Sequence, residues 1–295
     1  MGPLIESFWQ HLIQNNKKPA TIRAYLQNIK DMATWLEGTT GDPFSLANIT
    51  PIDLAEYKRY LMHQQRPATI NRAVAAVKVF YAWAAVEGLA PEGIAKGLRR
   101  LPEGRKSPKW LDRKEQLRLV RALQRDGTKR DIALIGLMLY GGLRVEEAVK
   151  VLTQDLEVGE RKARVIVRQG KGDKWREVPI NNDARKAILP HIENHPGGKW
   201  LFPSIRRAGH HITTRAAWQV LHKYATLAQV EVSPHRLRHT FCHNLVQAGV
   251  PLDQVAILAG HITNDGLPNV KTTVIYTQPG EADLRAAVDR ISWEG

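Results

Sequence analysis

The sequence predicts a mostly α-helical protein with one small antiparallel β-sheet, arranged as two domains. Apolar residues recur at helical spacing through most of the chain, whereas alternation that suits paired strands is clear only at residues 164–180. The chain has 295 residues, which is longer than a typical single domain, and 43% of them are hydrophobic, which is enough to form ordinary cores. A segment rich in Pro, Gly and basic residues supplies a linker at 104–109, between expected domains at 1–103 and 110–295.

The first domain is expected to consist of short helices with recognisable start signals. Residues 4–13 place their apolar side chains on one helical stripe. Thr50, Pro51 and Asp53 combine an N-cap, a proline at the first helical position and a carboxylate at the third. A helix is therefore predicted to begin directly after Thr50.

An internal repeat suggests how this domain meets a partner. Pro19-Ala20-Thr21-Ile22 recurs as Pro67-Ala68-Thr69-Ile70, and each copy is predicted to open a helix that begins with its Thr and carries basic residues along one side. Two interpretations remain open: ordinary helices with solvated charges, or a pair of crossing helices whose N-termini and basic residues grip a duplex backbone. The second interpretation makes these residues candidate DNA contacts: Thr21, Arg23, Lys30, Thr69, Asn71, Arg72 and Lys78.

The second domain is expected to build helices around one hairpin. Asp112 and Glu115 form a capping-box pattern, and the apolar run up to Tyr140 predicts a buried helix that ends at Gly141-Gly142, before a short helix at 143–147. The strands are separated by a turn at 169–173. Further helical patterns cover residues 183–193, 213–229, 235–248, 252–259 and 281–292.

The charge of the chain points to a polyanionic partner. Lys and Arg number 43 against 29 Asp and Glu, a formal charge of +14, which favours nucleic acid over a membrane surface. The excess is divided between both domains, so we expect a two-domain clamp on DNA. The single cysteine, Cys242, cannot form an internal disulfide, and no long apolar run or signal peptide is evident, so a cytoplasmic, nucleoid-associated protein is expected.

The densest cluster of chemically useful residues opens the helix after Ser233. His235 and Arg238 are three positions apart and share a face, where a guanidinium fork and an imidazole suit a bound phosphate. A metal site is the alternative, because His235, His239 and His243 recur every four residues with Cys242 beside them. The neighbouring arginines would place fixed positive charge among such ligands, so no metal or other cofactor is expected.

These motifs together resemble the tyrosine site-specific recombinases, in particular their Xer and phage or transposon integrase branch. The resemblance rests on Gly141-Gly142-Leu143-Arg144, on His235-Arg236-Leu237-Arg238-His239, on Gly260-His261 and on the late Tyr276, and it covers nearly the whole chain. It implies a four-helix core-binding domain (SAM-like) ahead of a catalytic domain. It also implies a protein that acts on double-stranded DNA as an oligomer.

The resemblance assigns a role to each position of the motif. Tyr276 becomes the nucleophile, and Arg144 and Arg238 bind the phosphate. Glu147 is the acidic residue that supports the first arginine. Lys171 is the hairpin lysine, and His235 and His261 are the remaining hydrogen-bonding groups. The chemistry supports this independently, since preplaced cations stabilise a phosphate that gains charge as a nucleophile adds. A phenol also needs positive charge or a base to react at neutral pH, for which His235 is the candidate, and Lys171 in its Gly-Lys-Gly turn is the candidate acid for the leaving 5′ oxygen.

Each position also has a purely structural explanation. Arg144 could cap a helix or pair with Glu147, Lys171 could be a solvated turn residue, His261 could cap a helix C-terminus, and Tyr276 could be a core tyrosine. An apparent inserted turn at 264–269 leaves open whether the tyrosine is mobile. The last helix, at 281–292, could dock on its own domain or on a neighbouring protomer.

The expected activity is therefore cutting and rejoining of DNA at specific sites through a 3′-phosphotyrosyl intermediate, without metal or ATP. The expected assembly is a tetramer on two duplexes, formed alone or with a paralogous recombinase. Two rivals are a type IB topoisomerase that relaxes supercoils and a DNA-binding regulator without catalysis. Dimer resolution, integration and transposon resolution are not distinguished by the sequence.

Overall fold

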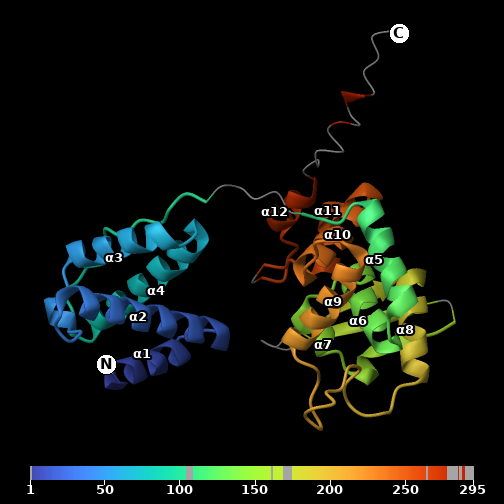
Figure 1. The fold of residues 1–295 in the computed structure, drawn as a ribbon, viewed down its shortest axis with the longest axis horizontal. Coiled ribbons are helices and arrows are strands. Elements are labelled where there is room, and N and C mark those ends of the chain that lie inside the picture. Colours follow the sequence, from blue (N-terminus) through green and yellow to red (C-terminus); the bar gives the residue numbers. More distant parts are fainter. Residues whose placement is uncertain are drawn as a thin grey trace. The chain divides into compact units, whose positions relative to one another are not determined.

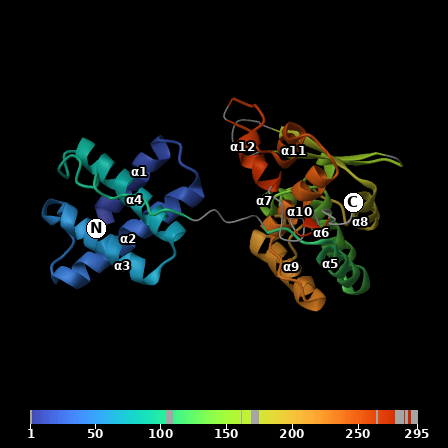
Figure 2. The same cartoon turned by 90° about the horizontal axis from the view of Figure 1, so that it is seen from above.

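The computed structural model describes residues 2–103, 109–160, 162–168, 175–263 and 265–277, together with Arg285, Val288 and Asp289. The chain divides into two compact units, Met1–Arg105 and Lys106–Gly295 (Figure 1, Figure 2). Each unit has its own hydrophobic core. Among the described helices, none is both long enough and apolar enough to cross a membrane.

The first unit is a four-helix domain. Its helices are α1 (Gly2–Gln14), α2 (Pro19–Thr40), α3 (Pro51–Gln64) and α4 (Pro67–Val86), with a short 3₁₀ turn at Leu46–Asn48. The helices α2 and α4 pack on each other, and α1 and α3 contact both of them. Apolar side chains at helical spacing fill the centre, including Phe8, Ile29, Met32 and Phe80, all fully buried.

The helix starts in this unit follow local sequence signals, with one correction. Thr50 and Asp53 form the predicted capping box in front of α3. The repeated segments do open α2 and α4, but those helices begin at the prolines, with Lys18 and Arg66 as N-caps that make no side-chain cap bond. The expectation that each helix begins with its Thr was wrong, because proline suits the first helical position and places the Thr inside the first turn.

The second unit surrounds a buried central helix, α6 (Lys129–Tyr140). It packs against α5 (Arg113–Asp126), α7 (Val145–Val149), α8 (Asn182–Glu193), α9 (Thr214–Ala228) and α10 (Pro234–Gln247). Seven consecutive residues of α6, 133–139, are buried, which explains its nearly continuous apolar sequence. The chain continues through α11 (Leu252–Ala259) and α12 (Val270–Thr273) into a 3₁₀ turn at Val274–Thr277.

A three-stranded antiparallel sheet lies beside these helices. Its strands are β1 (Leu156–Val158), β2 (Ala163–Arg168) and β3 (Trp175–Ile180), in the order β1-β2-β3. In the β2–β3 register Val165 pairs with Val178, and alternate side chains on this face are buried, which confirms the predicted hairpin. The strand β1 was not predicted, because its three residues are too short to show an alternating pattern.

Three expectations concern residues for which the structure gives no placement. The linker expected at 104–109 lies outside the described residues except for Lys109, and so does Lys171, which stands between β2 and β3 in the sequence. The helix expected at 281–292 lies outside them as well, apart from Arg285, Val288 and Asp289.

Candidate active site

The carboxylate of Glu147 is the centre of a cluster of arginines in the second unit. Arg144 is the N-cap of α7 and Glu147 stands three residues later, so the carboxylate accepts from both the backbone N–H of Arg144 and its Nη1, each at 2.8 Å. Arg144 also donates from Nη2 to the carbonyl of Gly260 at 3.2 Å. The side chain of Arg144 remains 37% exposed, the most open of the group, and can therefore reach an external anion.

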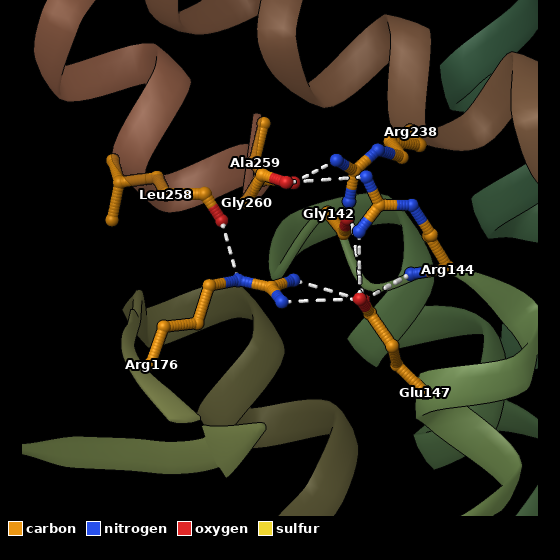
Figure 3. Close-up of polar contacts among 8 residues, drawn as sticks. All are labelled: Gly142, Arg144, Glu147, Arg176, Arg238, Leu258, Ala259 and Gly260. Atoms are coloured by element: carbon orange, nitrogen blue, oxygen red, sulfur yellow. Dashed lines mark hydrogen bonds and ion pairs between the residues drawn. The ribbon is translucent and has the colours of Figure 1, made fainter. Parts of the chain in front are cut away.

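Arg176 on β3 is a member of this cluster that the sequence analysis missed. Its Nη1 and Nη2 donate to the two oxygens of Glu147 at 3.0 and 2.8 Å, and its Nε donates to the carbonyl of Leu258 at 3.2 Å (Figure 3). Its side chain is only 4% exposed. The available signal was its even spacing from Val178 and Ile180, which places it on the buried face of the strand.

Arg238 enters the cluster from α10. Its Nη1 donates to the carbonyl of Gly142 at 2.7 Å and lies 3.9 Å from Glu147, and its Nη2 donates to the carbonyl of Ala259. Gly142 has a φ of 63°, and a Cβ there would lie 2.2 Å from the ring of Phe241. Only glycine therefore allows this turn to approach α10 closely enough for the contact. The predicted convergence of positions 144 and 238 is present in the structure (Figure 3).

The cluster carries surplus positive charge. Arg144, Arg176 and Arg238 surround the single carboxylate of Glu147 (Figure 3). Burial alone would raise the pKa of Glu147, but hydrogen bonds and charge from Arg176 and Arg144 outweigh it and lower that pKa to about 2. Burial, with the nearby charge of Arg144, lowers the pKa of Arg238 to about 10. At neutral pH the group therefore holds three cations and one anion, an arrangement suited to binding a further anion.

Tyr276 lies beside this cluster, and its side chain is buried. It is 2% exposed and packs with Phe241, Cys242, Val255 and Ala259. Its hydroxyl lies 3.0 Å from Nδ1 of His239, so its polar end meets a titratable group within the apolar pocket. Burial and the neighbouring Cys242 raise the pKa of Tyr276, while Arg238 opposes that change. The arrangement holds the phenol protonated in this conformation.

The described residues between His261 and Asn269 form a loop whose two ends are hydrogen-bonded to each other. Ile262 bridges Pro268, and the N–H of Asn269 donates to the carbonyl of His261 at 2.6 Å. The side chain of Asn269 then caps α12. The residues described around the expected inserted turn thus form a loop that returns the chain to His261, and α12 leads directly into the 3₁₀ turn of Tyr276.

The histidines take different positions around the tyrosine. The ring of His261 is stacked on that of Tyr276 at 6.0 Å, and its Nδ1 lies 3.2 Å from Oγ1 of Thr273. Burial and the charges of Arg238 and Arg144 lower the pKa of His261 to about 3, so it is neutral at pH 7. His235 is exposed, and its ring lies 5.8 Å from that of His239.

The histidines of α10 do not converge on one point. His239 contacts Tyr276, His243 stacks on Trp110 at 3.9 Å, and Cys242 is buried beside the tyrosine. No group of three or more His, Cys, Asp or Glu residues in the described part of the chain could hold a metal ion. The metal interpretation of the 235–243 repeat thus finds no support in the placement of these side chains.

The candidate DNA contacts of the first unit divide into two groups. Arg23, Lys30, Arg72 and Lys78 are exposed, whereas Thr21 and Thr69 are partly buried.

Asn71 has a different role from the expected one. It is 6% exposed, its amide exchanges hydrogen bonds of 2.9 and 2.7 Å with the backbone of Leu101, and it donates to Glu103 at 2.6 Å. It connects the backbone at Leu101 to α4. Because its side chain is buried and both of its amide N–H groups already donate, we do not propose it as a DNA contact.

Comparison with known proteins places this chain in a family. The model of the phage integrase family matches residues 109–282, and that of the phage integrase N-terminal SAM-like domain matches residues 5–88. The tyrosine recombinase XerA of Thermococcus kodakarensis is 32% identical over 97% of this chain and 94% of its own length. The tyrosine recombinase XerD of Ralstonia nicotianae is 30% identical over 90% and 85%.

Solved structures agree with this assignment. A crystal structure of XerA recombinase matches with a TM-score of 0.54 and 25% identity over 98% of both chains. A lambda integrase dimer bound to a COC′ core site matches in fold, with a TM-score of 0.72 at 16% identity over 94% of this chain and 95% of its own. The chain therefore belongs to the phage integrase family and is a homologue of the Xer tyrosine recombinases.

Proposed function

We propose that the protein cuts and rejoins DNA at specific sites through a covalent 3′-phosphotyrosyl link to Tyr276. The observation that carries this proposal is the meeting of Arg144 and Arg238 at one carboxylate, with the ring of Tyr276 within 5.4 Å of that of His239 and 6.0 Å of that of His261. These groups come from α7, α10 and the chain after α11, so their proximity is a property of the folded unit. The family assignment supports the same reaction class.

The arginines would act by stabilising charge. Attack on a phosphodiester adds negative charge to its nonbridging oxygens, and guanidinium groups fixed beforehand stabilise that charge without reorganising. Glu147 and backbone carbonyls hold Arg144 and Arg238 in place. Arg176 is too buried to touch DNA, so it would serve as a positioning residue that orients Glu147.

The hydroxyl of Tyr276 has to become accessible to DNA for the reaction. It is enclosed and its pKa is raised, so the free protein holds an unreactive nucleophile. A small shift of the short α12 and the following 3₁₀ turn would open the pocket and present the phenol, still beside His239, to a phosphate held by the arginines. Activity would then depend on DNA binding and assembly.

The remaining steps follow from the chemistry of the bond. Lys171 would give a proton to the departing 5′ oxygen, and His235 and His261 would supply further hydrogen bonds. The phosphotyrosyl bond resembles the broken phosphodiester in energy, so a 5′ hydroxyl of another strand can reverse the step. The reaction as proposed uses neither metal nor ATP.

Double-stranded DNA would be held by both units. Arg23, Lys30, Arg72 and Lys78 are the exposed cations proposed for the first unit, with the partly buried Thr21 and Thr69 at the helix starts. A relative of this fold was crystallised as a dimer on its core site, which supports an oligomer on DNA here. We propose a tetramer across two duplexes, either of this chain alone or with a paralogous recombinase, bound at the nucleoid.

A nicked suicide substrate tests the proposal. Cleavage beside the nick releases a short strand and traps the covalent adduct, so the native chain should form the adduct and Tyr276→Phe should not. Equal adduct from both proteins would refute the role of Tyr276, and no adduct from either would favour a regulator without catalysis. A two-site recombination assay beside a supercoil-relaxation assay separates a recombinase from a topoisomerase.

A further inference from the structure

His239, to which the sequence analysis assigned no catalytic role, is the histidine whose ring nitrogen contacts the phenol hydroxyl. Its Nδ1 is 3.0 Å from the hydroxyl of Tyr276, within hydrogen-bond distance, and the two rings are 5.4 Å apart. His235, the candidate base from the sequence, is exposed, and its ring stacks on that of His239 with their centres 5.8 Å apart. The nearer histidine is thus the one that directly follows Arg238.

The contact has a preferred direction of donation. Burial and the charges of His235 and Arg238 lower the pKa of His239 to about 4, so the ring is neutral at pH 7 and one nitrogen is free to accept. The thiol of Cys242 also lies against the phenol, but sulfur is a weaker acceptor than an imidazole nitrogen. In the tautomer that carries its proton on Nε2, Nδ1 of His239 accepts from the phenol, and the thiol can donate to the phenol oxygen; this is the tautomer that a base at position 239 requires.

His239 also borders open space. It lines a cavity of about 250 Å³, together with Ser233, His235 and Arg236. When Nδ1 accepts a proton the ring becomes a cation, and water in this cavity can solvate that cation. The imidazolium that forms is thus not sealed inside the apolar pocket.

Bound DNA would change the electrostatics in the required direction. In the free protein the charge of Arg238 disfavours a second cation at His239. A phosphate held by Arg144 and Arg238 brings a compensating negative charge, which favours protonation of the neighbouring imidazole. The ring would therefore become more basic when the substrate is in place.

We propose that His239 accepts the phenol proton of Tyr276 during strand cleavage, an inference that rests on the function proposed above. The Oη–H bond breaks and its proton passes to Nδ1 as the Oη–P bond forms. The P–O5′ bond then breaks, and the leaving oxygen takes a proton from a separate donor. In the rejoining step the 5′ hydroxyl returns its proton to that separate donor as it attacks phosphorus, the P–Oη bond breaks, and His239 gives its proton back to the departing phenolate.

The test compares two leaving groups on the same suicide substrate. One DNA has the natural bridging 5′ oxygen, and the other has sulfur there, which departs as a thiolate without protonation. His239→Asn keeps a polar acceptor beside the phenol but removes the base, so single-turnover adduct formation should fall by about 10²- to 10⁴-fold on both substrates. His243→Asn, one turn further along α10 and out of contact with Tyr276, is the matched control and should stay within a few-fold of the native rate.

A second measurement separates a chemical role from a structural one. Placing 3,5-difluorotyrosine at position 276 makes the phenol more acidic, and this should recover part of the loss in His239→Asn while leaving the native rate little changed. Melting curves and DNA affinity identify a variant that fails to fold, and His239→Gln then takes its place. Native adduct formation that is absent, or that survives Tyr276→Phe, would reject the proposed function and not this inference alone.

Three results would overturn the assignment. If His239→Asn forms the adduct at the native rate on the sulfur substrate, His239 acts on the leaving group and not on the phenol. A rate within about tenfold of the native protein would remove its role as a base, since a general base contributes at least about 10²-fold. A faster reaction would show that the contact restrains the tyrosine instead of activating it.

Discussion

Replacing Arg176 with methionine should selectively destabilise the second unit at neutral pH. Methionine keeps most of the buried volume but removes both hydrogen bonds to Glu147 and the one to the carbonyl of Leu258. Glu147, whose side chain is 10% exposed, keeps its hydrogen bonds from Arg144 and the more distant charge of Arg238 at 3.9 Å. Breaking a buried ion pair in this way costs about 3–5 kcal/mol.

The pKa of Glu147 reports the combined effect of Arg176 and Arg144 on its carboxylate, less the cost of burial. It is about 2 in the folded protein, against an ordinary 4.5. Each pKa unit corresponds to about 1.4 kcal/mol, so the folded environment stabilises the ionised carboxylate by about 3 kcal/mol. Because the pKa is lowered on folding, this stability is present above about pH 4.5 and is lost as the pH falls toward 2.

Hydrogen exchange of α6 peptides, measured against urea at pH 7 and pH 3, reports the opening free energy of this unit. We expect Arg176→Met to lower the opening free energy of the second unit by about 3 kcal/mol at pH 7. This is the lower end of the range for a broken buried ion pair, because Arg144 still pairs with Glu147. At pH 3 the difference from the native protein should be smaller. Arg164→Met is the matched control, because Arg164 makes exposed ion pairs with Glu157 and Glu177 on the same sheet and its loss should change little. This reasoning would be refuted if both substitutions had equal effects. It would also be refuted if the difference in opening free energy between Arg176→Met and the native protein were as large at pH 3 as at pH 7.

Two further substitutions test other contacts. Gly142→Ala should destabilise the second unit by about 2–4 kcal/mol, because φ is positive there and the new Cβ would lie 2.2 Å from Phe241; a melting temperature like that of the native protein would contradict this. Asn71→Ala should lower the stability of the first unit by about 1–3 kcal/mol through loss of its bonds to Leu101. In a binding titration done well below the melting temperature, the DNA affinity of this variant should be unchanged, whereas a large loss would return Asn71 to the DNA interface.

Local signals account for most of the secondary structure. The capping boxes at Thr50 and Asp112, together with helical spacing of apolar residues, predicted α3 and α5 from a few adjacent positions. The hairpin was predicted in the same way, since strand alternation is a property of consecutive residues. The strand β1 escaped because its three residues are held by pairing to β2, and that pairing is not visible in its own sequence.

The sequence by itself determined the two helical units, the excess of positive charge and the order of the motif from Arg144 to Tyr276. Only the tertiary structure decided that Arg176 supports Glu147 from 29 positions away, and that His239 meets the phenol from 37 positions away. Capping and periodicity act between neighbours along the chain, so the sequence displays them directly. Burial and the contacts of a side chain depend on which distant segments fold against it, and these fix the ionisation states of Glu147, His239 and Tyr276.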